Sequence, residues 1–247
     1  MQYPVETFTL EERARLAPHF TNLDRPVFAL VNLPETVKGA LFARYSRYQG
    51  TLRRLFLDEF ADSVPTGLPA WEGEEGKRAA DLYERIFLGY GDDSVAQLGG
   101  THIACEWVSN VVTKVLQRPR LAAYLEQSTR YIPYDAPMPG GGYRYYRDAD
   151  LGPRYEQAMD ALFDTYAASL PRVRAWVADE FPGDDSPARR RAIQAKALDL
   201  LRGLLPAASL SHMGIFATGQ TYEQLILHLL AHPLPEAREY GRMISCS

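Results

Sequence analysis

The sequence predicts an α+β fold, with a mostly helical domain packed on a small central β-sheet. Three observations predict it. Apolar residues recur at spacings of three and four over residues 34–60 and over most of the last hundred residues, as in amphipathic helices. β-branched and aromatic residues gather at 101–107 and 129–134, which favours strands. Glycine and proline at 63–76 and 137–142 predict loops between these segments.

The helix predicted over residues 34–60 begins at Pro34, which suits a first helical position, and Glu35 complements the positive end of its dipole. A second helix is predicted over residues 82–90, halted by the glycines at 89 and 91. Ser109 is expected to cap a third helix that runs to residue 116 or 117, and Pro119 disfavours helical geometry at Arg118.

Three more helices are predicted in the C-terminal part. The first covers residues 155–177 and ends before Pro182-Gly183. The second begins at Ser186-Pro187 and carries apolar residues as far as 205, before Pro206. The third is capped by Thr218-Gly219 and is broken at Pro233.

Composition excludes several classes of function. At 247 residues the chain is long enough to bury roughly 70–75% of its unfolded surface, as one large domain or two small ones; we expect a single domain over 1–247. A net charge of −4 argues against nonspecific nucleic-acid binding. No apolar run approaches the ~18 residues of a membrane span. Two cysteines without a bridge or zinc spacing favour a reducing, cytoplasmic compartment.

One stretch has the side chains of an anion site. Arg118-Pro119-Arg120 is followed, seven residues later, by Ser128 within Glu126-Gln127-Ser128-Thr129-Arg130-Tyr131. The planar fork of a guanidinium matches phosphate, so two arginines two residues apart can grip one phosphate or bridge two. The stretch points to a nucleotide or a nucleotide-like cofactor. Taken alone, it is more simply explained as a solvated basic strip, because the chain is rich in arginine.

Other constellations have simpler explanations. His228 and His232 stand four apart on a predicted helix, but no third metal ligand lies nearby in sequence, so we predict no metal site. Asp92 and Asp93 after a glycine are more typical of a turn or a helix cap than of paired acids. The arginine run at 189–191 is typical of a solvated helix face.

Together with the downstream Arg202-Gly203-Leu204-Leu205-Pro206, the Arg118-to-Tyr131 stretch resembles the flavin-dependent thymidylate synthases over about residues 37–240. That family carries Arg-His-Arg, seven residues, Ser, then Arg-Tyr, and later Arg-x-x-Leu-Pro. The resemblance implies a homotetramer, or an oligomer completed by a partner, of α+β subunits that binds FAD and dUMP at interfaces. It further implies that reduced flavin relays a one-carbon group from methylenetetrahydrofolate to the uracil ring, with NADPH as reductant.

The resemblance assigns two sets of residues. Those facing the flavin are Ser94, Arg118, Pro119, Arg120, Glu126, Thr218, Gln220 and Gln224. Those facing the nucleotide are Arg118, Glu126, Gln127, Ser128, Arg130 and Arg202.

Several positions depart from the family pattern, and among them Thr218, Gln220 and Gln224 stand where the family has Asn-x-Arg and a further Asn. Pro119 replaces its histidine, Asp92 replaces another histidine, and Leu229 aligns with the arginine that favours the ionised pyrimidine, so no catalytic residue is assigned. A leucine supplies neither charge nor donor. The alternatives are therefore an active synthase, a catalytically silent nucleotide- or flavin-binding relative that scaffolds a partner, and, disfavoured by charge, an RNA-binding module. We also expect the chain to be one part of a longer product that carries a second related domain.

Overall fold

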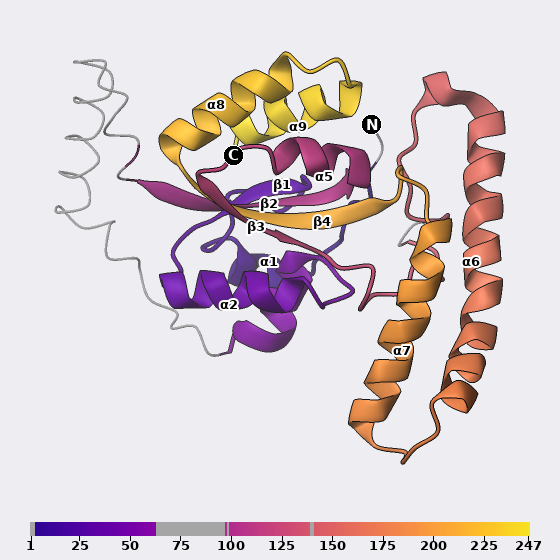
Figure 1. The fold of residues 1–247 in the computed structure, drawn as a ribbon. Coiled ribbons are helices and arrows are strands. Elements are labelled where there is room, and N and C mark those ends of the chain that lie inside the picture. The colour runs from indigo at the N-terminus through magenta and orange to yellow at the C-terminus, as the bar shows by residue number, and fades with distance from the viewer. Residues whose placement is uncertain (1–2, 63–96, 98, 139–140) are drawn as a thin grey trace, which may run out of the picture.

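A four-stranded antiparallel sheet in the order β1-β2-β4-β3 organises the chain (Figure 1). The computed structural model describes residues 3–62, 97, 99–138 and 141–247. The strands are β1 (Val27–Leu30), β2 (Gly100–Ser109), β3 (Ala122–Glu126) and β4 (Leu210–Thr218). With the helices described below, this sheet confirms the predicted α+β class.

Helices cover both faces of the sheet (Figure 1). One face packs against α5 (Asn110–Leu116), α8 (Gly219–Leu230) and α9 (Pro235–Ser245) through a continuous apolar cluster. The other face packs against α1 (Leu10–Leu16), α2 (Glu35–Tyr45), α3 (Leu52–Leu55) and the π-helical turn η1 (Phe56–Phe60) through a second cluster. The sheet is therefore the middle layer of three.

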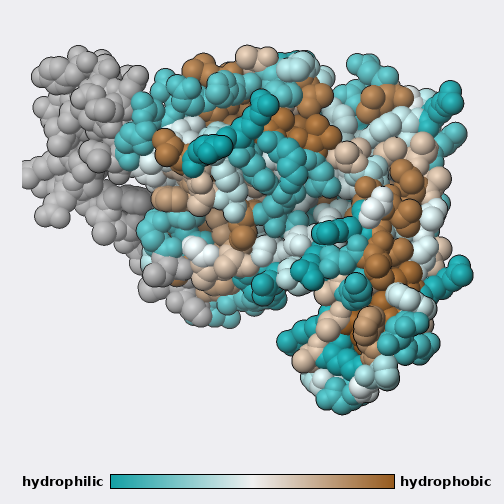
Figure 2. Space-filling model, viewed as in Figure 1, coloured by the Kyte–Doolittle hydropathy of each residue, from teal (hydrophilic) through white to brown (hydrophobic). Residues whose placement is uncertain are grey.

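A long helical hairpin stands at one side of these layers (Figure 1). It consists of α6 (Gly152–Glu180) and α7 (Pro187–Leu201), flanked by the short 3-10 turns η5 (Ala149–Leu151) and η6 (Arg202–Leu204). A third apolar cluster lies between the two helices and includes Tyr134 and Tyr145 from the loop before them. Figure 2 shows hydrophobic residues along the hairpin; its exposed large apolar side chains include Leu162, Trp176 and Leu200.

A β-bulge interrupts the pairing of β2 with β4. The register shifts between Cys105 and Val108, and Trp107 adopts a φ of 58°. A positive φ is unusual for a residue with a Cβ and stores strain. The Trp107 N–H, which the bulge removes from the ladder, donates to Nδ1 of His212 at 3.0 Å. Beside the bulge, the buried side chains of Glu106 and His212 belong to one polar cluster, because Tyr45 donates to Glu106 and stacks on His212.

Most predicted helices are confirmed. Ser109 accepts from the Val112 N–H and caps α5, as expected. The helices predicted after residues 155, 187 and 218 correspond to α6, α7 and α8. The strand predicted at 101–107 is the centre of β2. The helix predicted at 82–90, and the turn at Asp92 and Asp93, lie outside the described residues.

Two predictions were wrong. The single helix over 34–60 is divided, because the chain leaves α2 at Ser46 and Thr51 caps a new helix by accepting from the Arg54 N–H at 3.2 Å. The strand at 129–134 is a turn, in which the Tyr131 and Ile132 N–H groups donate to the Ser128 carbonyl. The preceding segment, β3, pairs with β4 instead.

No helix among the described residues combines the length and apolar character needed to cross a membrane.

Candidate functional site

Three of the residues that the resemblance assigns to the flavin line one cavity of about 390 Å³. Arg118 and Pro119 line it from the end of α5, and Gln224 lines it from α8. His228, one turn further along α8, and His232 complete its polar lining. A guanidinium, an amide and two imidazoles therefore face one space from segments about a hundred residues apart. Arg120 is exposed and does not line this cavity.

Glu126 fixes the helix that presents Arg118. Its carboxylate accepts hydrogen bonds from three side chains of α5 and its C-cap: Thr113 Oγ1 at 3.2 Å, Lys114 Nζ at 2.7 Å and Gln117 Nε2 at 2.7 Å. Since Glu126 ends β3, these bonds tie α5 to the sheet edge. Pro119 is held from the same strand, because the Tyr124 hydroxyl donates to its carbonyl at 2.7 Å. The cavity wall is thus anchored to the sheet.

Two arginines assigned to the nucleotide lie together at a second place. Nε of Arg130 is 2.9 Å from the Asp199 carboxylate, and Nη1 of Arg202 is 3.5 Å from it. Both arginine side chains are more than half exposed. The fold therefore gathers these guanidiniums around a shared carboxylate near the end of α7. Arg202 does not line the Arg118 cavity, so the two groups of arginines are separate within this chain.

Gln127 and Ser128 belong to the connection between these places. Gln127 is buried, donates from Nε2 to the Tyr48 carbonyl at 2.7 Å, and accepts at Oε1 from Arg144 at 2.8 Å. Ser128 donates its N–H to the Ser46 carbonyl at 3.2 Å, and its hydroxyl accepts from the Arg130 N–H at 3.3 Å. Gln127 is therefore engaged inside the protein, whereas Ser128 shapes the turn that presents Arg130.

The start of α8 gathers the remaining flavin-assigned residues. Thr218 is the N-cap of α8, and its hydroxyl donates to Oε1 of Gln97 at 3.2 Å. Gln220 accepts from the amide of the same Gln97. Ser94 lies outside the described residues. Thr218 and Gln220 thus share a partner close in sequence to Ser94, away from the end of α8 where His228 lies.

Leu229 is fully buried in the cluster between the sheet, α8 and α9. A Cβ added at Gly241 of α9 would lie 2.9 Å from the Leu229 Cβ, so the two helices are in close contact here. A side chain at position 229 therefore projects into the core. The α8 residues that line the cavity are Gln224, Leu225 and His228.

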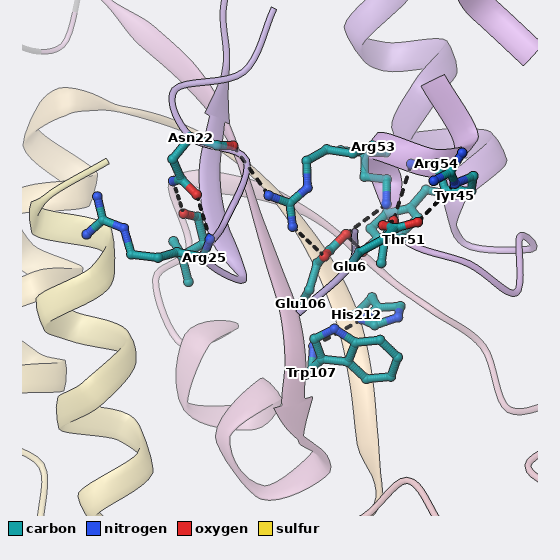
Figure 3. Close-up of polar contacts among 12 residues, drawn as sticks. Glu6, Asn22, Arg25, Tyr45, Thr51, Arg53, Arg54, Glu106, Trp107 and His212 are labelled. Atoms are coloured by element: carbon teal, nitrogen blue, oxygen red, sulfur yellow. Dashed lines mark hydrogen bonds and ion pairs between the residues drawn. The ribbon is translucent and has the colours of Figure 1, made fainter. Parts of the chain in front are cut away.

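Sequence reasoning missed a buried polar cluster beside the bulge (Figure 3). Glu106 is 1% exposed and accepts from the Leu52 N–H at 2.7 Å and the Tyr45 hydroxyl at 3.1 Å; Arg53 lies 3.5 Å away. Burial raises the pKa of Glu106, while the Arg53 guanidinium acts in the opposite direction. Burial, followed by the Glu106 charge, raises the pKa of Tyr45 well above its usual value.

His212 is the second centre of this cluster. Its ring stacks on Tyr45 with centroids 5.5 Å apart and meets Trp107 edge-on at 4.5 Å. Burial, and then the Arg144 charge, lower the pKa of His212 well below 6.5. Single charged or titratable residues inside apolar runs, Glu106 in β2 and His212 in β4, were the available sequence signal.

No group of three or more His, Cys, Asp or Glu side chains in the described part of the chain is arranged to hold a metal ion.

Residues 51–245 match the sequence model of the family described as thymidylate synthase complementing protein. The chain belongs to this family. It is 44% identical to a UPF0159 protein of Chlamydia pneumoniae over 96% of this chain and 47% of that protein. It is 33% identical to a UPF0159 protein of Thermoplasma acidophilum, over 81% of this chain and 44% of that protein. The chain thus spans about half the length of these relatives.

Among solved structures, the chain is similar to a flavin-dependent thymidylate synthase from Helicobacter pylori in complex with FAD and dUMP. The identity is 11% and the TM-score 0.44, over 77% of this chain and 81% of that one.

Proposed function

We propose that the chain is part of an FAD-dependent thymidylate synthase that methylates dUMP to dTMP, with methylenetetrahydrofolate as one-carbon donor and NADPH as reductant. The observation that carries this proposal is the cavity at which Arg118 and Pro119 face Gln224. These residues come from motifs far apart in sequence, and the resemblance assigns each of them to the flavin. Membership of the thymidylate synthase complementing family supports the same proposal.

The donor set of this cavity fits part of FAD. Arg118 would pair with a phosphate, and Gln224 would donate to or accept from a ring edge. At about 390 Å³ the cavity lies toward the small end of ligand sites, so it would hold one end of the dinucleotide. When bound, FAD would supply the redox chemistry of one-carbon transfer. The residues of this chain would bind and orient it.

Arg130 and Arg202 would bind the phosphate of dUMP in exchange for Asp199. The exposed guanidiniums already lie around one anionic group, and a phosphate ester presents more acceptor oxygens in a similar geometry. Arg118 and Arg202 do not line one cavity. We therefore propose that the Arg118 cavity of one chain meets the pair Arg130 and Arg202 of another, either in a homotetramer or within a longer protein. We also propose a cytoplasmic location for this nucleotide chemistry.

The test uses the purified chain without oxygen, loaded with FAD and reduced by NADPH. Addition of dUMP and methylenetetrahydrofolate should restore the visible absorbance of oxidised flavin and yield dTMP. Folded protein that takes up no FAD, or whose reduced flavin stays reduced after both dUMP and methylenetetrahydrofolate are added, would contradict the proposal.

A second candidate is a catalytically silent family member that binds flavin or nucleotide and supports an active partner. The burial of Leu229 favours it, because the position aligned with the family's activating arginine supplies no guanidinium to a cavity. If the chain is catalytically silent, it should bind flavin and dUMP, but by itself it should release no tritium from dUMP labelled at the reacting ring carbon. Tritium release by this chain alone would rule the silent role out.

A further inference from the structure

A buried arginine outside the nucleotide motifs lines a separate cavity. Arg144 is 6% exposed and lies in the loop before α6, where its carbonyl accepts from the Leu210 N–H of β4 at 2.9 Å. The cavity beside it measures about 280 Å³. Neither Arg118 nor Arg202 lines this space. It is therefore distinct from both arginine groups described above.

The protein satisfies few of the five N–H donors of Arg144. Nη2 donates to Oε1 of Gln127 at 2.8 Å, whereas the buried Nε has no hydrogen-bond partner among the described residues. Nε2 of His212 lies 3.4 Å from Nη2. Nδ1 of His212 accepts from the Trp107 N–H, so in the neutral imidazole Nε2 carries the proton. The 3.4 Å contact therefore joins two donors and is no hydrogen bond.

The positive charge of Arg144 also has no counter-ion among the described residues. None of the ion pairs formed by the described residues includes it. The buried carboxylate of this region, Glu106, is directed to Arg53, Tyr45 and the Leu52 N–H (Figure 3). His212 is neutral because burial lowers its pKa. With Glu106 ionised, the three buried residues Glu106, Arg53 and Arg144 together carry one excess positive charge, and a buried unpaired charge is costly.

Aromatic rings fix the orientation of this cation. The Arg144 guanidinium carbon lies 4.4 Å from the centroid of the Tyr134 ring and 5.2 Å from that of Trp107. Contact with ring faces stabilises a guanidinium while leaving its edge free for hydrogen bonds. The backbone of Trp107 is held in its strained conformation by the bulge. Rigid neighbours of this kind are typical of a preorganised site.

The other walls of the cavity are mostly apolar. Trp107, Pro133, Ala136, Pro137 and Met138 line it, and Gln49 and Gly50 complete the lining. A site with one fixed charge and apolar walls is suited to a small organic ion. The cavity offers one guanidinium, which balances one negative charge. A carboxylate carries one charge and fits the paired N–H groups of a guanidinium, whereas a phosphate dianion carries two.

We propose that this cavity binds a small planar carboxylate, whose anionic end pairs with Arg144 and whose ring packs against Trp107 and the prolines. The cavity shares no lining residue with the proposed flavin cavity, and neither Arg130 nor Arg202 lines it. The bound carboxylate supplies the counter-charge and the acceptors that the described residues do not offer to the Arg144 guanidinium.

Benzoate is the probe for this site. The chain has three tryptophans, so Trp71→Phe with Trp176→Phe leaves Trp107 as the reporter. Benzoate should change its fluorescence saturably. Benzyl alcohol, which has the ring without the charge, and inorganic phosphate, which has charge without the ring, should each bind roughly tenfold more weakly or worse. The assay needs neither FAD nor dUMP, so its result is independent of thymidylate synthase activity.

Three variants locate the binding. Arg144→Gln should weaken benzoate binding roughly tenfold or more, whereas Arg147→Gln, which removes a nearby arginine that does not line the cavity, should leave it unchanged. Ala136 is an exposed loop residue, so Ala136→Leu should narrow the cavity and weaken binding without disturbing Arg144. If Arg144→Gln does not fold, the Ala136→Leu result decides.

Each contrary result would overturn the proposal. These are an unsaturable response to benzoate by folded protein, equal affinity for benzyl alcohol, tighter binding of phosphate, and unchanged benzoate affinity in both Arg144→Gln and Ala136→Leu.

Discussion

Arg130 forms an ion pair with Asp199, with 2.9 Å between Nε and the carboxylate oxygen. The same carboxylate lies 3.5 Å from Arg202, so two guanidiniums assigned to the nucleotide share one internal counter-ion. A phosphate ester arriving at these arginines must compete with Asp199. The carboxylate therefore preorganises the arginines and also weakens their hold on an external anion.

Removal of this competitor gives the first prediction. Asp199→Asn should raise the affinity for dUMP roughly two- to fivefold, because exposed ion pairs contribute up to about 1 kcal/mol. Equilibrium dialysis with labelled dUMP measures the effect. Asp185→Asn is the matched control, since Asp185 pairs with Arg190 at 2.8 Å on the hairpin and should have no influence. Unchanged or weaker dUMP binding in Asp199→Asn would show that these arginines do not hold the phosphate.

The second prediction concerns Leu229, the buried position that the sequence resemblance matches to an arginine of the family. Leu229→Arg should lower the free energy of unfolding by about 3 kcal/mol or more, because it places an unpaired charge in the core against α9. Urea denaturation measures this loss. The control is Leu227→Arg, whose side chain is on the exposed side of α8 at 57% exposure and should change stability by about 0.5 kcal/mol at most. A stable Leu229→Arg protein with increased turnover would mean that α8 presents this position to the site.

The third prediction is a pH dependence from His212. Its pKa is lowered below 6.5 by burial and by Arg144, so below that pH the unfolded chain binds a proton that the folded chain does not. The stability it contributes is present above pH 6.5 and is lost as pH falls. In His212→Asn, the Asn Oδ1 replaces Nδ1 as acceptor for the Trp107 N–H without titrating.

Between about pH 7.0 and about pH 5.5, the wild type should lose about 1 kcal/mol more unfolding free energy than His212→Asn. Urea denaturation at both pH values gives this difference. His19 and His102, whose pKa values are also lowered by burial, remain in both proteins and cancel. Equal losses in the two proteins would show that His212 is not buried in its neutral form.

The fourth prediction tests the cavity at the end of α5. Arg118→Met should weaken FAD binding roughly tenfold or more, because a hydrogen bond to a charged group is lost, with little change in stability for an exposed residue. Fluorescence titration of FAD measures the affinity. Arg242→Met, on α9 and paired with Glu239 at 3.7 Å, serves as the control and should bind FAD like the wild type. Equal affinity in both variants would remove Arg118 from the flavin site.

The helices could be predicted from sequence where an apolar face recurs over many turns, as in α6, α7 and α8. The strand β4 could not, because it is buried on both faces from Leu210 to Ile215 and shows no alternation of apolar and polar residues. The division between α2 and α3 was missed because the helical pattern of apolar residues is longer than either helix. Apolar spacing continues through Ser46 and Gly50, although the backbone does not.

The structure shows where the residues named for the site lie, and what they bind stays a prediction. Arg118 and Gln224 were named from sequence and line one cavity. The polar cluster of Glu106, His212 and Arg144 was not predictable, because each member acquires its role from partners on distant segments and from the bulge at Trp107. Periodicity does not record such contacts.

The most direct test of the central claim is the visible absorption spectrum of the purified chain after FAD is added and free flavin is removed by gel filtration. We predict that flavin absorbance co-elutes with the wild-type protein and is lost in Arg118→Met. Folded wild-type protein that elutes without flavin at any FAD concentration would contradict the claim that the α5–α8 cavity is a flavin site.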